Sequence, residues 1–242
     1  MKRELHALTR RALIAGGLLF AGSVCQAQAA PSPEDLYRQL APSVWLVHAF
    51  DAQGLPTGSG SAVVIGPGML LTNCHVVARS RSISVTNDGV TRDALLQYVD
   101  PQRDMCQIIA RDLAAPAVQL ADSDQLAIGQ KVYTLGHPLG LSDQTFSDGM
   151  VSALPRRPQT REVLRIQTTA PISPGSSGGG LFDAQGRLVG LTTWQMRMGQ
   201  NINFAIPVNW ARDLAERSEA LLHTAAAEAL PASAAALSAP VR

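Results

Sequence analysis

Short runs of apolar and β-branched residues, separated by Gly, Pro, Asn and Asp, fill the middle of the chain from about Ser43 to Ala205. Such runs are typical of β-strands with turns between them. We predict two sets of six strands, divided near residues 113–128. The first set is Val44–Phe50, Ser59–Ile65, Met69–Thr72, Ser82–Val85, Ala94–Val99 and Met105–Ala110; the second is Lys131–Leu135, Thr145–Ala153, Val163–Thr169, Leu181–Phe182, Leu188–Thr193 and Ile202–Ala205. Because no ten-residue amphipathic helix interrupts them, the pattern disfavours a parallel α/β sheet and leaves antiparallel barrels or sandwiches.

Helical spacing is predicted only after the last strand. From Val208 to Thr224 the apolar residues Trp210, Leu214 and Leu221 recur among charged ones, which predicts an amphipathic helix packed on a barrel. Residues 225–242 are rich in Ala, Ser and Pro and contain no aromatic residue, so we expect a disordered tail there.

Residues 1–29 have the pattern of an export signal. Basic residues precede an apolar run from Ala12 to Val24, and Ala27-Gln28-Ala29 follows as a cleavage site. A transmembrane anchor is the alternative, but the run is much shorter than the roughly twenty apolar residues that span a bilayer. We expect cleavage near Ala30, a periplasmic or secreted location, and no membrane insertion after cleavage. The segment Thr9–Ile14 leaves both the Sec and the twin-arginine routes open.

Composition excludes several classes of function. The residues after the leader are enough for one large all-β unit or two small domains. The leader carries a net charge of +3, so the remainder of a chain with net charge +1 is near −2. This charge argues against nucleic acid or an anionic membrane as a partner. No His and Cys residues have the spacing of zinc ligands, so we expect no metal or organic cofactor.

Segment 174–181, Pro-Gly-Ser-Ser-Gly-Gly-Gly-Leu, has a composition that permits unusual backbone conformations. A serine in such a turn can expose its hydroxyl beside free amides, although a plain flexible turn has the same composition. The spacing Gly175-x-Ser177-x-Gly179 also matches the nucleophile elbow of α/β-hydrolases. That fold requires a helix after the serine and a later histidine. Strand, turn and strand are predicted here instead, and the only later histidine is His223, near the tail.

Two polar residues upstream adjoin buried strands. His75 follows an apolar run, where a lone histidine is usually structural. Asp104 opens another apolar run after a turn that begins at Asp100, and an aspartate in such a turn is usually a turn former. Asp100 is the rival carboxylate. Together with Ser177 these residues appear in the order His, Asp, Ser across two β-rich halves, which is the order of chymotrypsin-fold proteases.

From about Ser43 to Val208 the chain resembles the protease domain of HtrA-type (Deg) proteins. The segments that carry the resemblance are Gly58–Ile65, Thr72–Val77, Asp100–Ile108, Leu135–Gly140 with Gly149–Leu154, and Thr169–Leu181 followed by Phe204–Pro207. The resemblance implies an all-β fold of two antiparallel six-stranded barrels, chymotrypsin-like, with a C-terminal helix. It also implies a catalytic triad of His75, Asp104 and Ser177, and an oxyanion hole formed by Gly175, Ser176 and Ser177.

The resemblance further implies the reaction, which is hydrolysis of peptide bonds in extended or unfolded exported polypeptides. The substrate-binding residues that it implies are Pro171, Ile172, Ser173, Pro174, Thr193, Trp194 and Gln195. None of them is acidic, and a buried substrate cation would lack a partner. We therefore expect a small or medium apolar side chain at P1, the substrate residue before the cleaved bond.

Two departures from the HtrA pattern keep other interpretations open. Ser176 stands where asparagine is usual, and Gly180 replaces a usual proline and is expected to add chain freedom. We also expect a short form of the family, without the PDZ domain that usually follows the protease domain. A catalytically silent chymotrypsin-fold protein that binds peptides or an envelope partner is therefore the alternative, and an esterase with the same nucleophile is a third reading. The sequence leaves both a monomer and an oligomer open.

Two histidines outside the predicted triad are expected to be structural, and two cysteines are expected to form a disulfide. His48, in a strand, and His137, in a turn, are interpreted as structural. Cys74 precedes the predicted base, and Cys106 lies two residues beyond Asp104 on the same face of a strand. Because the base and Asp104 must touch, we expect the two cysteines to be close and to form a disulfide in an oxidising compartment. Two buried free thiols are the alternative.

Overall fold

A computed structural model describes residues 31–195 and 201–229. The strands within these residues form two closed antiparallel barrels of six strands each. The first barrel contains β1 (Val44–Phe50), β2 (Pro56–Gly66), β3 (Met69–Thr72), β4 (Ser82–Asn87), β5 (Val90–Asp100) and β6 (Met105–Ile109). The second contains β7 (Lys131–Gly136), β8 (Thr145–Ala153), β9 (Ile166–Thr168), β10 (Gly180–Asp183), β11 (Leu188–Gln195) and β12 (Asn203–Pro207). The predicted fold class is confirmed, and the predicted export signal lies outside the described residues.

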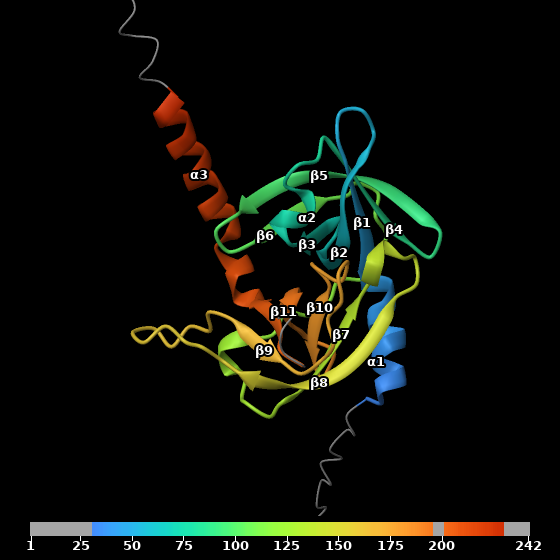
Figure 1. The fold of residues 1–242 in the computed structure, drawn as a ribbon, viewed down its shortest axis with the longest axis vertical. Helices are drawn as coiled ribbons and strands as arrows, with labels where there is room; N and C mark the ends of the chain where they lie inside the picture. Colours follow the sequence, from blue (N-terminus) through green and yellow to red (C-terminus); the bar gives the residue numbers. More distant parts are fainter. Residues whose placement is uncertain (1–30, 196–200, 230–242) are drawn as a thin grey trace, which may run out of the picture.

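The two barrels have the same strand arrangement and lie one above the other in Figure 1. The hydrogen-bonded order is β1-β2-β3-β6-β5-β4 in the first barrel and β10-β11-β12-β9-β8-β7 in the second. Two buried apolar clusters fill the barrel interiors. A third cluster joins Val63 and Leu71 of the first barrel to Leu135 and Phe182 of the second. Burying side chains of this size stabilises the fold by about 1.5–3 kcal/mol each, so the third cluster holds the barrels together.

Strand β5 shows the largest difference from the predicted strand ends. It begins at Val90, whereas the hydrophobic pattern placed its start at Ala94. Asp88 and Gly89 have φ angles of 47° and 73° and form a two-residue hairpin turn that joins β4 directly to β5. The first residues of β5 are exposed and mostly polar, which explains why an apolar pattern misses them.

Helix α1 (Pro33–Leu40) precedes the first barrel and is absent from the sequence prediction. The Ser32 hydroxyl caps it by accepting a hydrogen bond from the backbone N–H of Asp35 at 3.1 Å. Serine followed by proline and acidic residues is a helix-start pattern that could have revealed α1. Its Tyr37 ring lies 5.8 Å from the ring of Phe146 in β8, so α1 packs against the second barrel. A short 3₁₀ turn, η1 (Ala41–Ser43), connects it to β1.

The C-terminal helix is divided and longer than predicted. A 3₁₀ segment, η4 (Val208–Arg212), is followed by α3 (Leu214–Ala229), which lies along the first barrel beside β5 in Figure 1. The expectation of a disordered tail from residue 225 is therefore wrong for residues 225–229, because alanine and glutamate favour continuation of the helix. The rest of the predicted tail lies outside the described residues. Among the helices of the described ranges, none is long and apolar enough to cross a membrane.

Candidate active site

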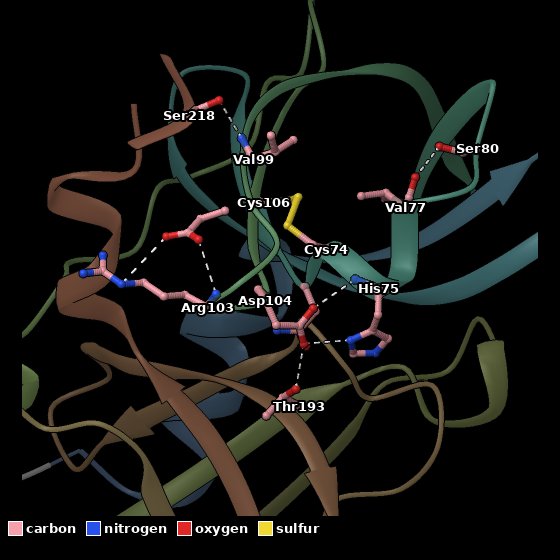
Figure 2. Close-up of a disulfide and its surroundings, with 12 residues drawn as sticks. Cys74, His75, Val77, Ser80, Val99, Arg103, Asp104, Cys106, Thr193 and Ser218 are labelled. Atoms are coloured by element: carbon pink, nitrogen blue, oxygen red, sulfur yellow. Dashed lines mark hydrogen bonds and ion pairs between the residues drawn. A yellow bond between two sulfur atoms is a disulfide. The ribbon is translucent and has the colours of Figure 1, made fainter. Parts of the chain in front are cut away.

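The predicted base and the predicted carboxylate meet at one end of the first barrel. His75 lies in the short helix α2 (Cys74–Val77), which follows β3, and Asp104 is the last residue before β6. The imidazole Nδ1 of His75 lies 2.7 Å from Oδ2 of Asp104, and the backbone N–H of His75 donates to Oδ1 at 3.0 Å (Figure 2). Two of the three predicted triad residues are therefore in direct contact.

Asp104 has a φ angle of 54°, in the left-handed region that non-glycine residues rarely adopt. Such a conformation persists only where the surroundings hold it. The Asp104 carbonyl accepts hydrogen bonds from the side-chain amide of Asn73 at 2.9 Å and from the backbone N–H of Cys74 at 3.3 Å. The hydroxyl of Thr193, from β11 of the second barrel, donates to Oδ2 at 3.0 Å (Figure 2). Both barrels thus fix this carboxylate.

These contacts determine the charge of Asp104. Burial of the carboxyl raises its pKa, but the hydrogen bonds from the side chain and backbone of His75, the charge of His75 and the Thr193 hydroxyl together hold the pKa below its ordinary value. The carboxylate is therefore ionised at neutral pH. An ionised partner at Nδ1 favours the tautomer with its proton on Nδ1, which leaves Nε2 able to accept a proton.

The predicted nucleophile lies in the loop between β9 and β10 of the second barrel. Among the hydrogen bonds of the described residues, the hydroxyl of Ser177 donates to the carbonyl oxygen of Thr193 at 2.8 Å rather than to His75. The Ser177 carbonyl accepts a hydrogen bond from the backbone N–H of Ser61 in β2 at 2.7 Å. The loop is therefore attached to the first barrel, and the Ser177 hydroxyl is held by β11 of its own barrel.

The turn before Ser177 has the geometry of a type II β-turn. The backbone N–H of Ser176 donates to the Ser173 carbonyl at 2.9 Å, Pro174 occupies the second position, and Gly175 occupies the third with φ of 88°. The Pro174 carbonyl accepts a hydrogen bond from the backbone N–H of Leu139 at 2.7 Å. Since C=O and N–H of a trans peptide point in opposite directions, the Gly175 N–H points away from Leu139.

Neighbouring residues fix the backbone at both departures near the nucleophile. Ser176 is held through its backbone, because its carbonyl accepts hydrogen bonds from the Gly179 N–H at 2.9 Å and from the Thr192 hydroxyl at 2.6 Å. The prediction that Gly180 adds chain freedom is wrong. Gly180 pairs with neighbours in β7 and β11, and a Cβ there would lie 2.2 Å from the buried ring of Phe182. Close packing therefore requires the glycine.

The predicted substrate-binding residues occupy two stretches beside the nucleophile loop: the Ser173 carbonyl accepts from the Ser176 N–H at 2.9 Å, and the Thr193 carbonyl accepts from the Ser177 hydroxyl at 2.8 Å. In the first stretch Pro171, Ser173 and Pro174 are exposed and Ile172 is buried. In the second stretch, the end of β11, Thr193 is buried while Trp194 and Gln195 are exposed. The Trp194 ring lies against the Phe204 ring of β12, with 4.0 Å between centroids. An aromatic pair therefore borders this end of β11.

Asp100 and the two histidines interpreted as structural, His48 and His137, take no part in the His75–Asp104 contact. Asp100 is buried, and its Oδ2 accepts a hydrogen bond from Nε of Arg217 in α3 at 2.5 Å. His137 is buried, and its ring nitrogens lie 3.1 Å and 3.4 Å from backbone carbonyl oxygens. Burial lowers the pKa of His137, although hydrogen bonds to carbonyls of neighbouring residues oppose this. His48 lies half-buried in β1.

Cys74 and Cys106 are joined by a disulfide with 4.9 Å between the Cα atoms (Figure 2). The bond connects α2 to β6 directly beside the His75–Asp104 pair. Three polar contributors to the site are absent from the sequence prediction: the side chain of Asn73 and the hydroxyls of Ser61 and Thr193. The sequence marks Thr193 only as part of the substrate edge, because the register that brings it to Asp104 depends on the docking of two barrels.

Two antiparallel six-stranded barrels, with a His–Asp pair on one and a serine in a glycine-rich turn on the other, define the chymotrypsin-like class. A family profile described as the trypsin-like peptidase domain matches residues 60–191, more than half of the chain. The chain belongs to this family.

Its relatives are HtrA-type proteases, which confirms the resemblance inferred from the motifs. The chain is 40% identical to the "Periplasmic pH-dependent serine endoprotease DegQ" of Escherichia coli (66% of this chain, 37% of the relative). It is 35% identical to the "Putative serine protease HhoB" of Synechocystis sp. (66% of this chain, 40% of the relative). The chain thus spans at most 40% of the length of these two curated relatives.

Solved structures agree with this assignment. The "HtrA-type protease AlgW with tripeptide" is 34% identical, with a TM-score of 0.66, and the match covers 77% of this chain and 64% of that one. The serine endoprotease from Yersinia pestis is 29% identical, with a TM-score of 0.67, and the match covers 78% and 67% of the two chains.

Proposed function

We propose that the protein is a serine endopeptidase in which His75, Asp104 and Ser177 form the catalytic triad. The observation that carries the proposal is the ionised Asp104 held at Nδ1 of His75 from both barrels. This arrangement prepares Nε2 as a general base, which a merely structural histidine does not need. Membership of the trypsin-like peptidase family and the serine protease names of the relatives support the same activity.

The chemistry is acyl transfer in two steps. The Ser177 hydroxyl turns from the Thr193 carbonyl to the imidazole, its proton passes to Nε2, and its oxygen attacks the peptide carbonyl. Asp104 stabilises the imidazolium that forms. The backbone N–H groups of Gly175 and Ser177 donate to the developing oxyanion, and the type II turn at Gly175 suits this role. His75 then returns the proton to the leaving amine, and water releases the acyl group by the reverse sequence.

The proposed substrates are extended segments of exported polypeptides in the periplasm or outside the cell. The end of β11, from the buried Thr193 to the exposed Trp194 and Gln195, offers a strand edge to which an extended peptide can add by backbone hydrogen bonds. A relative carries the word periplasmic in its name, and one similar structure contains a tripeptide. Both facts support this choice of compartment and substrate class.

The proposed P1 preference is for Val, Ala, Leu or a similar residue. The two stretches that border the nucleophile contain no acidic residue to pair with a substrate Lys or Arg. Cleavage of a peptide library by the mature protein, with sites mapped by mass spectrometry, checks this preference. Dominant cleavage after Lys or Arg would contradict it, and Ser177→Ala protein serves as the control for contaminating proteases.

The second candidate function is a silent member of the fold that binds peptides without cleaving them. The hydrogen bond of the Ser177 hydroxyl to Thr193 rather than to His75 is the observation that favours it. Labelling with a fluorophosphonate separates the two candidates. We expect the wild type and Ser176→Ala to be labelled and Ser177→Ala to remain unlabelled. An unlabelled wild type would support the silent binder, and labelling of Ser177→Ala would reject Ser177 as nucleophile.

A further inference from the structure

Ser61 places a fully buried hydroxyl of the first barrel against the second barrel. The residue lies in β2 and has no exposed surface. Its Oγ accepts a hydrogen bond from the backbone N–H of His137 at 2.9 Å and donates to the carbonyl oxygen of Gly175 at 3.3 Å. Its own backbone N–H donates to the Ser177 carbonyl at 2.7 Å. One residue therefore contacts both the nucleophile loop and the loop that begins at His137.

Both of these loops determine the direction of the Gly175 amide. The Pro174 carbonyl, on the N-terminal side of Gly175, is held by the Leu139 N–H in the short segment η3 (Pro138–Gly140). The Gly175 carbonyl, on the C-terminal side, is held by the Ser61 hydroxyl. Ser61 also fixes the start of the loop that carries Leu139, through the His137 N–H. The Ser61 hydroxyl thus supports the Gly175 amide in two ways, directly through the Gly175 carbonyl and indirectly through the His137 N–H.

A glycine at this position makes external support necessary. Gly175 has φ of 88°, but glycine adopts positive and negative φ about equally well, so the residue itself does little to fix the type II turn. In a type I turn the peptide between the second and third residues points the opposite way. The Pro174–Gly175 peptide would then present its oxygen where the N–H now points. Hydrogen bonds from outside the turn therefore decide whether the Gly175 amide faces an oxyanion.

We propose that Ser61 is a positioning residue for the oxyanion hole. Its hydroxyl locks the type II turn at Gly175 by joining that turn to the His137–Leu139 segment. A hydroxyl suits this role because it can accept from an N–H and donate to a C=O at once, which neither an aliphatic side chain nor an ammonium group can do. The inference rests on the proposed function, because it assigns Ser61 an effect on an amide whose catalytic use is itself proposed.

The test compares Ser61→Ala with a closely matched control, Ser123→Ala. Ser123 is also fully buried, and its hydroxyl likewise donates to a backbone carbonyl, that of Val189 at 2.8 Å, and accepts from a backbone N–H, that of Asn209 at 3.3 Å. Both substitutions therefore remove the same kinds of hydrogen bond. Only Ser61 reaches the oxyanion turn, so an effect of general destabilisation should appear in both variants and an effect of positioning in one.

The readouts are kcat, KM and the inhibition constant of a peptidyl boronic acid, whose tetrahedral adduct places an oxygen in the oxyanion hole. For Ser61→Ala we expect kcat to fall roughly tenfold to a hundredfold, which is less than the roughly 10²–10³-fold loss on removing an oxyanion donor itself. The boronate should bind more weakly by a similar factor, and KM should change by less than about twofold, because ground-state binding is untouched. Ser123→Ala should retain the wild-type values of all three constants.

Three other results are informative. A Ser61→Ala variant with the same kcat as Ser123→Ala would overturn the inference. A fall in kcat without weaker boronate binding would also overturn it, because the lost hydroxyl would then act outside the oxyanion hole. A wild-type chain that neither cleaves peptides nor reacts with fluorophosphonate would instead reject the proposed function.

Discussion

Replacing both cysteines of the Cys74–Cys106 disulfide should lower the stability of the protein by an amount that its loop length predicts. The bond joins residues separated by 32 positions. The chain-entropy relation gives about 4 kcal/mol at 25 °C for a loop of this length, because the crosslink restricts the unfolded chain. At about 2–4 °C per kcal/mol for a protein of this size, the melting temperature of Cys74→Ala/Cys106→Ala should fall by roughly 8–16 °C.

The single variants provide the internal control. Each of them already breaks the crosslink, so Cys74→Ala, Cys106→Ala and the double variant should lose nearly the same free energy of unfolding. A double-mutant cycle should therefore give a coupling energy close to the loss in either single variant. The assay is thermal and urea unfolding followed by circular dichroism, together with thiol titration of the denatured wild type. Additive losses, or two titratable thiols in oxidised wild-type protein, would refute the reasoning.

Two further predictions concern Asp104. Thr193→Val removes the hydroxyl that donates to Oδ2 of Asp104 at 3.0 Å. Because a hydrogen bond to a charged group contributes about 1.5–3 kcal/mol, kcat/KM should fall roughly tenfold to a hundredfold. A folded variant with wild-type kcat/KM would contradict this prediction. Because the folded-state pKa of Asp104 is lowered, its stabilising effect should be complete above the unfolded pKa and be lost as pH falls through the folded pKa. Urea unfolding of wild type and Asp104→Asn from about pH 7 to 3 checks this, since the unfolded carboxyl titrates near 3.9. A difference in stability that stays constant over that range would disagree.

The strand pattern predicted two sets of six strands because most strands bury at least one apolar face, and the resemblance to HtrA-type proteases then implied two closed barrels. Its failures have the same cause. The start of β5 is polar and exposed and is held only by pairing with β4, which no hydrophobic count detects. Helix α1 has only two buried residues, Leu36 and Leu40, so its apolar face is too short to show a helical repeat in the sequence. Both elements are marked instead by local turn and capping residues.

Some residues of the candidate site could likewise be predicted from the sequence, and others could not. The resemblance to HtrA-type proteases selects His75, Asp104 and Ser177, because the segments that contain them match the motifs of that family in the same order. The role of Ser61 depends on contact with a residue 114 positions away, and that of Thr193 on contact across 89 positions. Such contacts follow from how two closed barrels dock. Neither residue has a local sequence pattern that would reveal its partner.

The division of the proposed triad between two barrels has a consequence for how the protein would fail. His75 and Asp104 belong to the first barrel and Ser177 to the second, so the proposed reacting groups come from opposite sides of an interface. A small slip of one barrel against the other would separate base from nucleophile while every strand stayed paired. Activity would then disappear under mild heating before the circular dichroism signal changed. A compound that wedged the interface open would inhibit the protein without entering its substrate cleft.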